Sequence, residues 1–113
     1  MNAPRLEAPS QLGDLVSYQE GSVVSQTLIK SKAGTVTVFA FDAGEGLSEH
    51  TAPFDALVLA VDGRASISVA DTSHVLSSGQ ILRLPASVPH SVQADEPFKM
   101  LLVMVKERSH SDG

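Results

Sequence analysis

The sequence contains no cysteine and no tryptophan, and it is poor in aromatic residues overall. The absence of cysteine excludes disulfides, thiolate nucleophiles, zinc fingers and iron–sulfur clusters, so histidine and carboxylate side chains are the expected ligands or catalysts. Basic residues are also few. The 8 Lys and Arg residues against 13 Asp and Glu residues give a formal net charge of −5, which disfavours nucleic acid as a partner.

Long hydrophobic runs are missing as well. The amino-terminal segment lacks the apolar region of a secretion signal, and no apolar run approaches the ~20 residues that span a bilayer. We therefore expect a cytoplasmic protein with no membrane partner. The 113 residues suit a single domain, 1–113, in which residues 1–13 form a loosely ordered arm and residues 106–113 a polar tail.

The sequence does contain many short apolar segments of the strand type, separated by turn-forming residues. Apolar residues nowhere recur at helical spacing over a long window, and only 11–18 is expected to hold a helical turn. This pattern predicts an all-β barrel or sandwich with less than about a tenth of its residues in helix. The predicted strands are 23–29, 35–41, 56–61, 65–69, 74–76, 81–84, 88–92 and 98–105.

Two of these strands, 56–61 and 98–105, are apolar on both faces. A barrel buries only the inner face of each strand by itself, so the outer faces are expected to pack against a second copy of the chain. We therefore predict a homodimer. The strand at 56–61 is also expected to form a hairpin with 65–69, because Asp62–Gly63 between them is a turn signal.

The first candidate motif runs from Gly44 to Gly63 and reads GEGLSEHTAPFDALVLAVDG. It resembles the first motif of the cupin superfamily, in which a glycine is followed by two histidines, a glutamate and a second glycine. Gly44, His50 and Gly63 fall on the spacing of that motif. Ala52 stands where the second histidine is expected, and Ala56 stands where the glutamate is expected.

The second candidate motif begins at Gly79 and reads GQILRLPASVPH. It is similar to the second cupin motif, with Gly79, Pro85 and His90 on the expected spacing. Ser87 and Ala94 replace a glycine and an asparagine of that motif. The chain thus resembles the compact, single-domain bacterial cupins of the RmlC-like type. The resemblance implies a double-stranded β-helix, also called a jelly-roll barrel, over roughly residues 23–105.

The resemblance also implies a site. In metal-binding cupins the motif histidines and the glutamate converge on one divalent ion inside the barrel, and this role carries over to His50 and His90 only. With Ala52 and Ala56 at the other two positions, it implies a degenerate site that holds a divalent transition metal such as Zn, Ni, Fe or Mn weakly. Chemically, imidazole suits such ions.

Asp55 is a candidate third ligand, because a bulge at Pro53–Phe54 would turn its side chain inward. The alternative is that Asp55 is a corner residue that bonds local backbone, as Asp commonly does in turns. Each of His50 and His90 has a comparable alternative, that of a rim histidine whose ring nitrogens find ordinary hydrogen-bond partners.

The predicted function is the binding of a small, polar or anionic molecule in a pocket lined by His50 and His90, with Phe54 and Asp55 at its entrance. One alternative is an enzyme, either metal-dependent and oxygenase-like or a metal-free isomerase or epimerase that uses a histidine as general base. Another is an assembly protein whose pocket is vestigial. No phosphate loop, dinucleotide fingerprint or Ser-His-Asp order favours nucleotide chemistry or acyl transfer.

Overall fold

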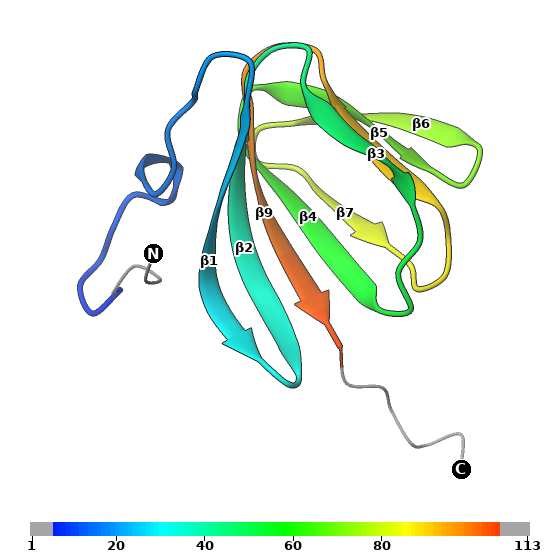
Figure 1. The fold of residues 1–113 in the computed structure, drawn as a ribbon, viewed down its shortest axis with the longest axis horizontal. Coiled ribbons are helices and arrows are strands. Elements are labelled where there is room, and N and C mark those ends of the chain that lie inside the picture. Colours follow the sequence, from blue (N-terminus) through cyan, green and yellow to red (C-terminus); the bar gives the residue numbers. More distant parts are fainter. Residues whose placement is uncertain (1–5, 107–113) are drawn as a thin grey trace.

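The structure is a computed structural model that describes residues 6–106. In this range nine strands and one short 3-10 turn form two facing sheets (Figure 1). The elements are η1 (Leu12–Asp14), β1 (Val23–Ser31), β2 (Gly34–Phe41), β3 (Gly46–His50), β4 (Asp55–Asp62), β5 (Arg64–Val69), β6 (Thr72–Ser77), β7 (Ile81–Leu84), β8 (His90–Ala94) and β9 (Phe98–Val105).

The five-stranded sheet has the order β1-β2-β9-β4-β7, and the four-stranded sheet has the order β3-β8-β5-β6. Every strand pair is antiparallel, and most neighbours in space are distant in sequence. This is the double-stranded β-helix of a jelly-roll barrel, so the predicted all-β fold is confirmed. The predicted helical turn is confirmed too, as the three-residue η1, and no helix within residues 6–106 could cross a membrane.

The core lies between the sheets, because inward and outward side chains alternate along each strand. Phe41 on β2 stands opposite Phe98 on β9, and the two fully buried rings lie 5.8 Å apart between centroids. Val58 on β4 and Ile67 on β5 are also fully buried. Burial of a side chain of this size contributes about 1.5–3 kcal/mol to stability, so these residues hold the two sheets together.

The predicted hairpin between 56–61 and 65–69 is wrong, because β4 and β5 belong to different sheets. β4 pairs with β7 and β9, whereas β5 pairs with β6 and β8. Gly63, with a φ of 71°, carries the chain from one sheet into the other. An Asp-Gly pair specifies a tight bend, but it does not specify that the flanking strands bond to each other.

Two strand boundaries also differ from the prediction. β8 starts at His90 rather than at residue 88. Val88 is still part of a turn, in which its N–H donates to Pro85 O, and Pro89 has no N–H to donate to a neighbouring strand. β3 was not predicted as a strand. Its sequence, GLSEH, is mainly polar, and its last three residues are exposed.

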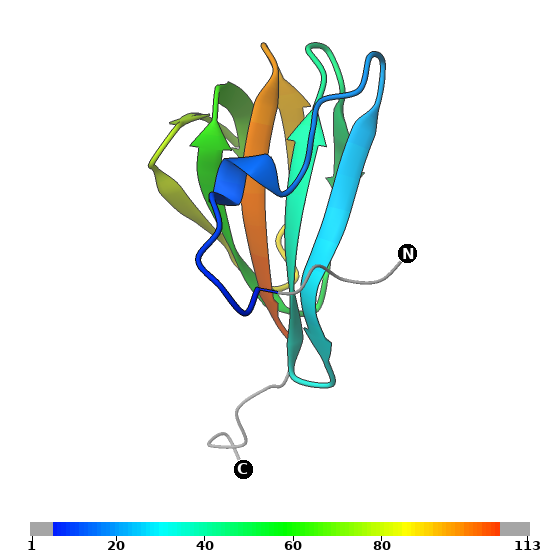
Figure 2. The same ribbon diagram turned by 90° about the vertical axis from the view of Figure 1, so that its left-hand side faces the viewer.

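The segment that holds η1 packs on the outer face of the five-stranded sheet, as Figure 2 shows. Val16 is buried there against Val38 and Ala40 of β2, and Leu12 and Leu101 pack against the same cluster. Of the predicted arm at 1–13, residues 1–5 lie outside the described range, as do residues 107–113 of the predicted tail. Residues 12–18 therefore cover part of the apolar outer face, over β2 and β9.

Polar contacts fix this segment in place. The Lys99 ammonium donates a 2.6 Å hydrogen bond to Gly13 O and lies 4.8 Å from the centre of the Tyr18 ring. The Tyr18 hydroxyl donates to Asp62 at 2.5 Å. Burial, the hydrogen bond to Asp62 and the charges of Asp62 and Glu96 all raise the pKa of Tyr18, so this hydroxyl stays protonated and remains a donor.

Candidate functional site

A cavity of about 50 Å³ lies between the two sheets. A single water needs roughly 10–15 Å³ on this measure, so the cavity takes a group of a few heavy atoms. Its walls come from both sheets and from the loop that joins β3 to β4. The lining residues are Leu47, His50, Ala52, Phe54, Ala56, Val58, Leu84, His90, Val92, Met100, Leu102 and Met104. His50 and His90 are the polar members of this set.

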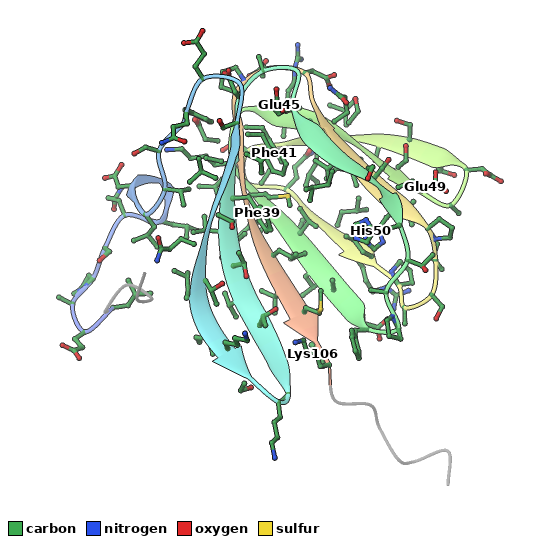
Figure 3. All side chains as sticks on the ribbon, viewed as in Figure 1. Phe39, Phe41, Glu45, Glu49, His50 and Lys106 are labelled. Carbon is green, nitrogen blue, oxygen red and sulfur yellow. The ribbon has the colours of Figure 1, made fainter. Side chains whose placement is uncertain are left out.

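The pairing of β3 with β8 brings the two histidines together. His50 ends β3, His90 begins β8, and the two residues are cross-strand partners. Their Nε2 atoms lie 3.1 Å apart, with ring centroids 4.4 Å apart and ring planes at 71°. His90 is buried, at 9% exposure, whereas His50 is exposed, and Figure 3 shows the His50 imidazole directed from β3 toward the interior. The predicted proximity of the two rings is confirmed.

The other ring nitrogens determine where the hydrogens are. His50 Nδ1 lies 2.9 Å from Ser48 O, and His90 Nδ1 lies 3.2 Å from Val88 O. A carbonyl oxygen only accepts hydrogen bonds, so both Nδ1 atoms carry the hydrogen and donate it. When the rings are neutral, both Nε2 atoms are therefore acceptors 3.1 Å apart, and the contact between them becomes a hydrogen bond only when one ring gains a proton on Nε2.

Burial lowers the pKa of His90. The hydrogen bond to Val88 O opposes this effect, and the charge that His50 acquires when protonated adds to it, because a second positive charge would lie close by. His90 is therefore neutral at pH 7, with a lone pair available on Nε2.

This lowered pKa predicts a pH dependence. In the chelator-treated protein, NMR titration of the His90 ring should give a midpoint below the value of about 6.5 for an unperturbed histidine. The unfolded chain then binds the proton more tightly than the folded chain. The stability that neutral His90 contributes is present above pH ~6.5 and is lost as the pH falls toward the folded pKa. A His90 midpoint at or above that of the urea-unfolded chain would contradict the prediction.

The structure separates the two predicted entrance residues. Phe54 lines the cavity, but Asp55 does not. Asp55 accepts a 2.8 Å hydrogen bond from Ala86 N and lines a groove on the outer face. The register with β9 is regular from Asp55 to Ala60, so Ala56 faces inward and Asp55 faces outward. The predicted bulge at Pro53–Phe54 does not turn Asp55 inward, so the third-ligand prediction is wrong and the alternative of a corner residue that bonds backbone is the correct one.

Ala52 and Ala56 both line the cavity with His50 and His90. These are the two motif positions at which alanine stands in place of a metal-ligating side chain. Among residues 6–106 there is no group of three or more His, Asp or Glu side chains that could hold a metal ion. The donor set for a metal is thus the two Nε2 atoms. A four-ligand site of the kind that the motifs specify does not fit this chain.

Sequence reasoning missed part of the cavity wall. Met100, Leu102 and Met104 on β9 line it, whereas the predicted pocket included no residue of the strand 98–105. Period-two alternation from the inward Met100 would have placed all three on that wall. Ser87, at φ 64°, joins the loops at this end of the barrel by donating its N–H to Ala52 O.

Comparisons with known proteins agree with this geometry. Residues 37–105 match the family model of the cupin domain, which is more than half of the chain. The chain belongs to the cupin superfamily. A search of curated proteins gives no match.

Several solved structures are similar to this cupin. A conserved protein of unknown function from Streptococcus pyogenes is 31% identical, with a TM-score of 0.90, over 96% of this chain and 95% of that one. A cupin superfamily protein from Desulfitobacterium hafniense is also 31% identical, with a TM-score of 0.87, over 95% and 97% of the two chains. A cupin 2 conserved barrel domain protein from Leptotrichia buccalis is 41% identical, with a TM-score of 0.81, over 84% of this chain and 46% of that one.

Proposed function

We propose that this cupin binds a small molecule in the cavity of its barrel. One observation carries the proposal: two imidazoles with Nε2 atoms 3.1 Å apart are the polar lining residues of an otherwise apolar cavity. Apolar walls with a few convergent polar groups are typical of small-molecule sites, in which the polar groups orient the ligand. The cavity volume of about 50 Å³ limits the buried part of the ligand to a few heavy atoms.

A divalent transition metal such as Zn, Ni, Fe or Mn would be held by His50 and His90 alone. Both Nε2 lone pairs are available, and an Nδ1–H that donates to a carbonyl is the usual arrangement of a metal-bound histidine. When bound, such an ion would supply Lewis acidity. Two protein donors hold an ion weakly, so we propose that any metal exchanges readily with buffer and chelator.

Ligand binding is favoured over catalysis by the partners of the two rings. A histidine general base is commonly oriented by a carboxylate, whereas His50 and His90 both donate to backbone carbonyls. Asp55, the carboxylate that was a candidate third ligand, bonds the backbone at Ala86 instead. The enzyme alternative, metal-dependent and oxygenase-like or metal-free and isomerase-like, would have to use His50 or His90 without a carboxylate that orients the ring.

A ligand-observed NMR screen with small fragments tests the proposal. The Ala56→Leu variant adds bulk to the cavity wall, and Val75→Leu, at a 62% exposed position on β6, is the matched control. We expect fragments that bind the wild type to lose their signal with Ala56→Leu and to keep it with Val75→Leu. Fragments that bind both variants equally, or the absence of any binding fragment, would count against a ligand site in the barrel.

We also propose that the chain forms a homodimer through the outer face of the five-stranded sheet. The segment around η1 covers Val38, Ala40 and Leu101, but it leaves Leu57 of β4, Ile81 of β7 and Val105 of β9 exposed on the same face. Leu57, Ile81 and Val105 are 41%, 59% and 53% exposed. An apolar sheet face of this kind is typical of a surface that packs on a partner.

The dimer is testable by sedimentation equilibrium at micromolar concentration. The wild type is expected to be dimeric, and a Leu57→Lys, Ile81→Lys double variant is expected to be monomeric because it places charges in the apolar contact. Val75→Lys is the control, since Val75 is at least as exposed as Leu57 and Ile81 but lies on the other sheet. A monomeric wild type, or a dimer that Val75→Lys disrupts instead, would contradict this assignment of the interface.

A further inference from the structure

The polar group of the bound ligand can be specified further from the hydrogen positions of the histidine pair. This inference rests on the proposed function. Each ring is held in one orientation by its Nδ1–H, which donates to the carbonyl of Ser48 or of Val88. A flip of either ring would break that bond and leave a carbonyl without its donor. The orientation with each Nε2 toward the other ring therefore satisfies both Nδ1–H groups, and it leaves two Nε2 acceptors facing each other at 3.1 Å without a donor when the rings are neutral.

In this orientation, with both rings neutral, the cavity presents acceptors and no side-chain donor. The two Nε2 lone pairs converge, and apart from the histidines the lining side chains are aliphatic, thioether or aromatic groups. A ligand oxygen without hydrogen, such as that of a carboxylate, would add a third acceptor and a buried charge to a site that cannot compensate either one. An N–H or O–H group would instead donate to one or both Nε2 atoms.

We propose that the ligand of this cupin presents an N–H or O–H donor to His50 and His90 on a short apolar body. The apolar body contacts the wall formed by Phe54, Met100 and Met104. The donor end lies beside His50, whose exposure leaves a path to solvent for any larger part of the ligand. This specification differs from the polar or anionic ligand that the sequence suggests, because the sequence does not reveal which ring nitrogens carry hydrogen.

A pair of isosteric probes tests the inference. Isobutyramide and isobutyrate differ in that the amide has an NH₂ donor where the acid has a second oxygen. The titrations are run at pH 8, where ordinary imidazoles are neutral, on chelator-treated protein, and are followed by the ring signals of His50 and His90 and the methyl signals of Met100 and Met104. We expect isobutyramide to shift these signals with a dissociation constant at least about tenfold lower than that of isobutyrate.

The His50→Phe variant provides the control, because His50 is exposed and its replacement leaves the buried ring of His90 in place. We expect the preference for the amide to fall in this variant while both probes still shift the methionine methyls. Equal or tighter binding of isobutyrate to the wild type would overturn the inference that the ligand presents a hydrogen-bond donor, and so would an unchanged preference for the amide in His50→Phe. Either result would leave the proposal of small-molecule binding intact. If neither probe binds, the inference of a donor ligand is overturned, and the result also counts against the proposed function.

Discussion

Replacement of Gly63 by alanine is expected to destabilise the barrel by about 3 kcal/mol or more, as measured by urea unfolding. Two effects add at this position. The φ of 71° lies in the left-handed region, and a Cβ would lie 2.0 Å from Pro97 O. Pro97 immediately precedes Phe98, the fully buried first residue of β9, so the carbonyl cannot move away without disturbing the core.

Gly79→Ala is the matched control. Gly79 has a φ of 89°, but a Cβ there would meet nothing within 4 Å. Its replacement should therefore cost only the backbone strain, about 1–2 kcal/mol. Equal losses for the two variants would show that the contact with Pro97 is relieved at no cost, and would contradict the role of Gly63 as a closely packed corner between the sheets.

Gly63 also illustrates what the sequence can predict about this fold. Glycine favours turns, and the three motif glycines Gly44, Gly63 and Gly79 all have positive φ. The pairing of the strands around them could not be predicted in the same way. Both β4 and β5 bury alternate apolar residues, so the local pattern suits a hairpin as well as a corner between two sheets. Only contacts with strands far along the chain decide between the two.

In the candidate site, too, some features could be predicted from the sequence and others could not. The spacing of the two motifs predicted that His50 and His90 meet, and it placed Ala52 and Ala56 in the same cavity. The outward position of Asp55 depends on whether one bulge is present, and a bulge of one residue leaves little trace in sequence. The acceptor character of both Nε2 atoms depends on distances to backbone carbonyls, which a sequence does not contain.

Restoring the two missing donors should convert this cavity into a tight metal site. In an Ala52→His, Ala56→Glu variant, four donors would face one cavity in place of two, because both alanines already line it with His50 and His90. We expect zinc to bind the variant at least about a hundredfold more tightly than the wild type, since each added donor removes the need for a water ligand. After dialysis against a mild chelator, the variant should retain one equivalent of metal and the wild type should lose it.

Thermal unfolding provides a second measurement of the same effect. Without metal, a buried glutamate at position 56 should destabilise the variant, because the carboxylate is desolvated in an apolar cavity. Zinc at a hundred times its dissociation constant should then stabilise the folded variant by about 2.7 kcal/mol, whereas the wild type should show little change at that concentration. The control is Ala52→His, Leu57→Glu, which places the carboxylate one residue later, on the exposed outer face.

Each outcome of this comparison decides a separate point. If the wild type retains one equivalent of metal after dialysis, weak binding by two histidines is wrong and another donor must take part. If the control variant binds zinc as tightly as Ala52→His, Ala56→Glu, the carboxylate does not need to face the cavity, and the metal lies elsewhere. If neither variant gains affinity, side chains at positions 52 and 56 do not reach the Nε2 atoms of His50 and His90. The expected result is a gain in the first variant that clearly exceeds the gain from Ala52→His in the control, and it would mean that the cavity lacks donors and not geometry, so that Ala52 and Ala56 account for the weak metal binding.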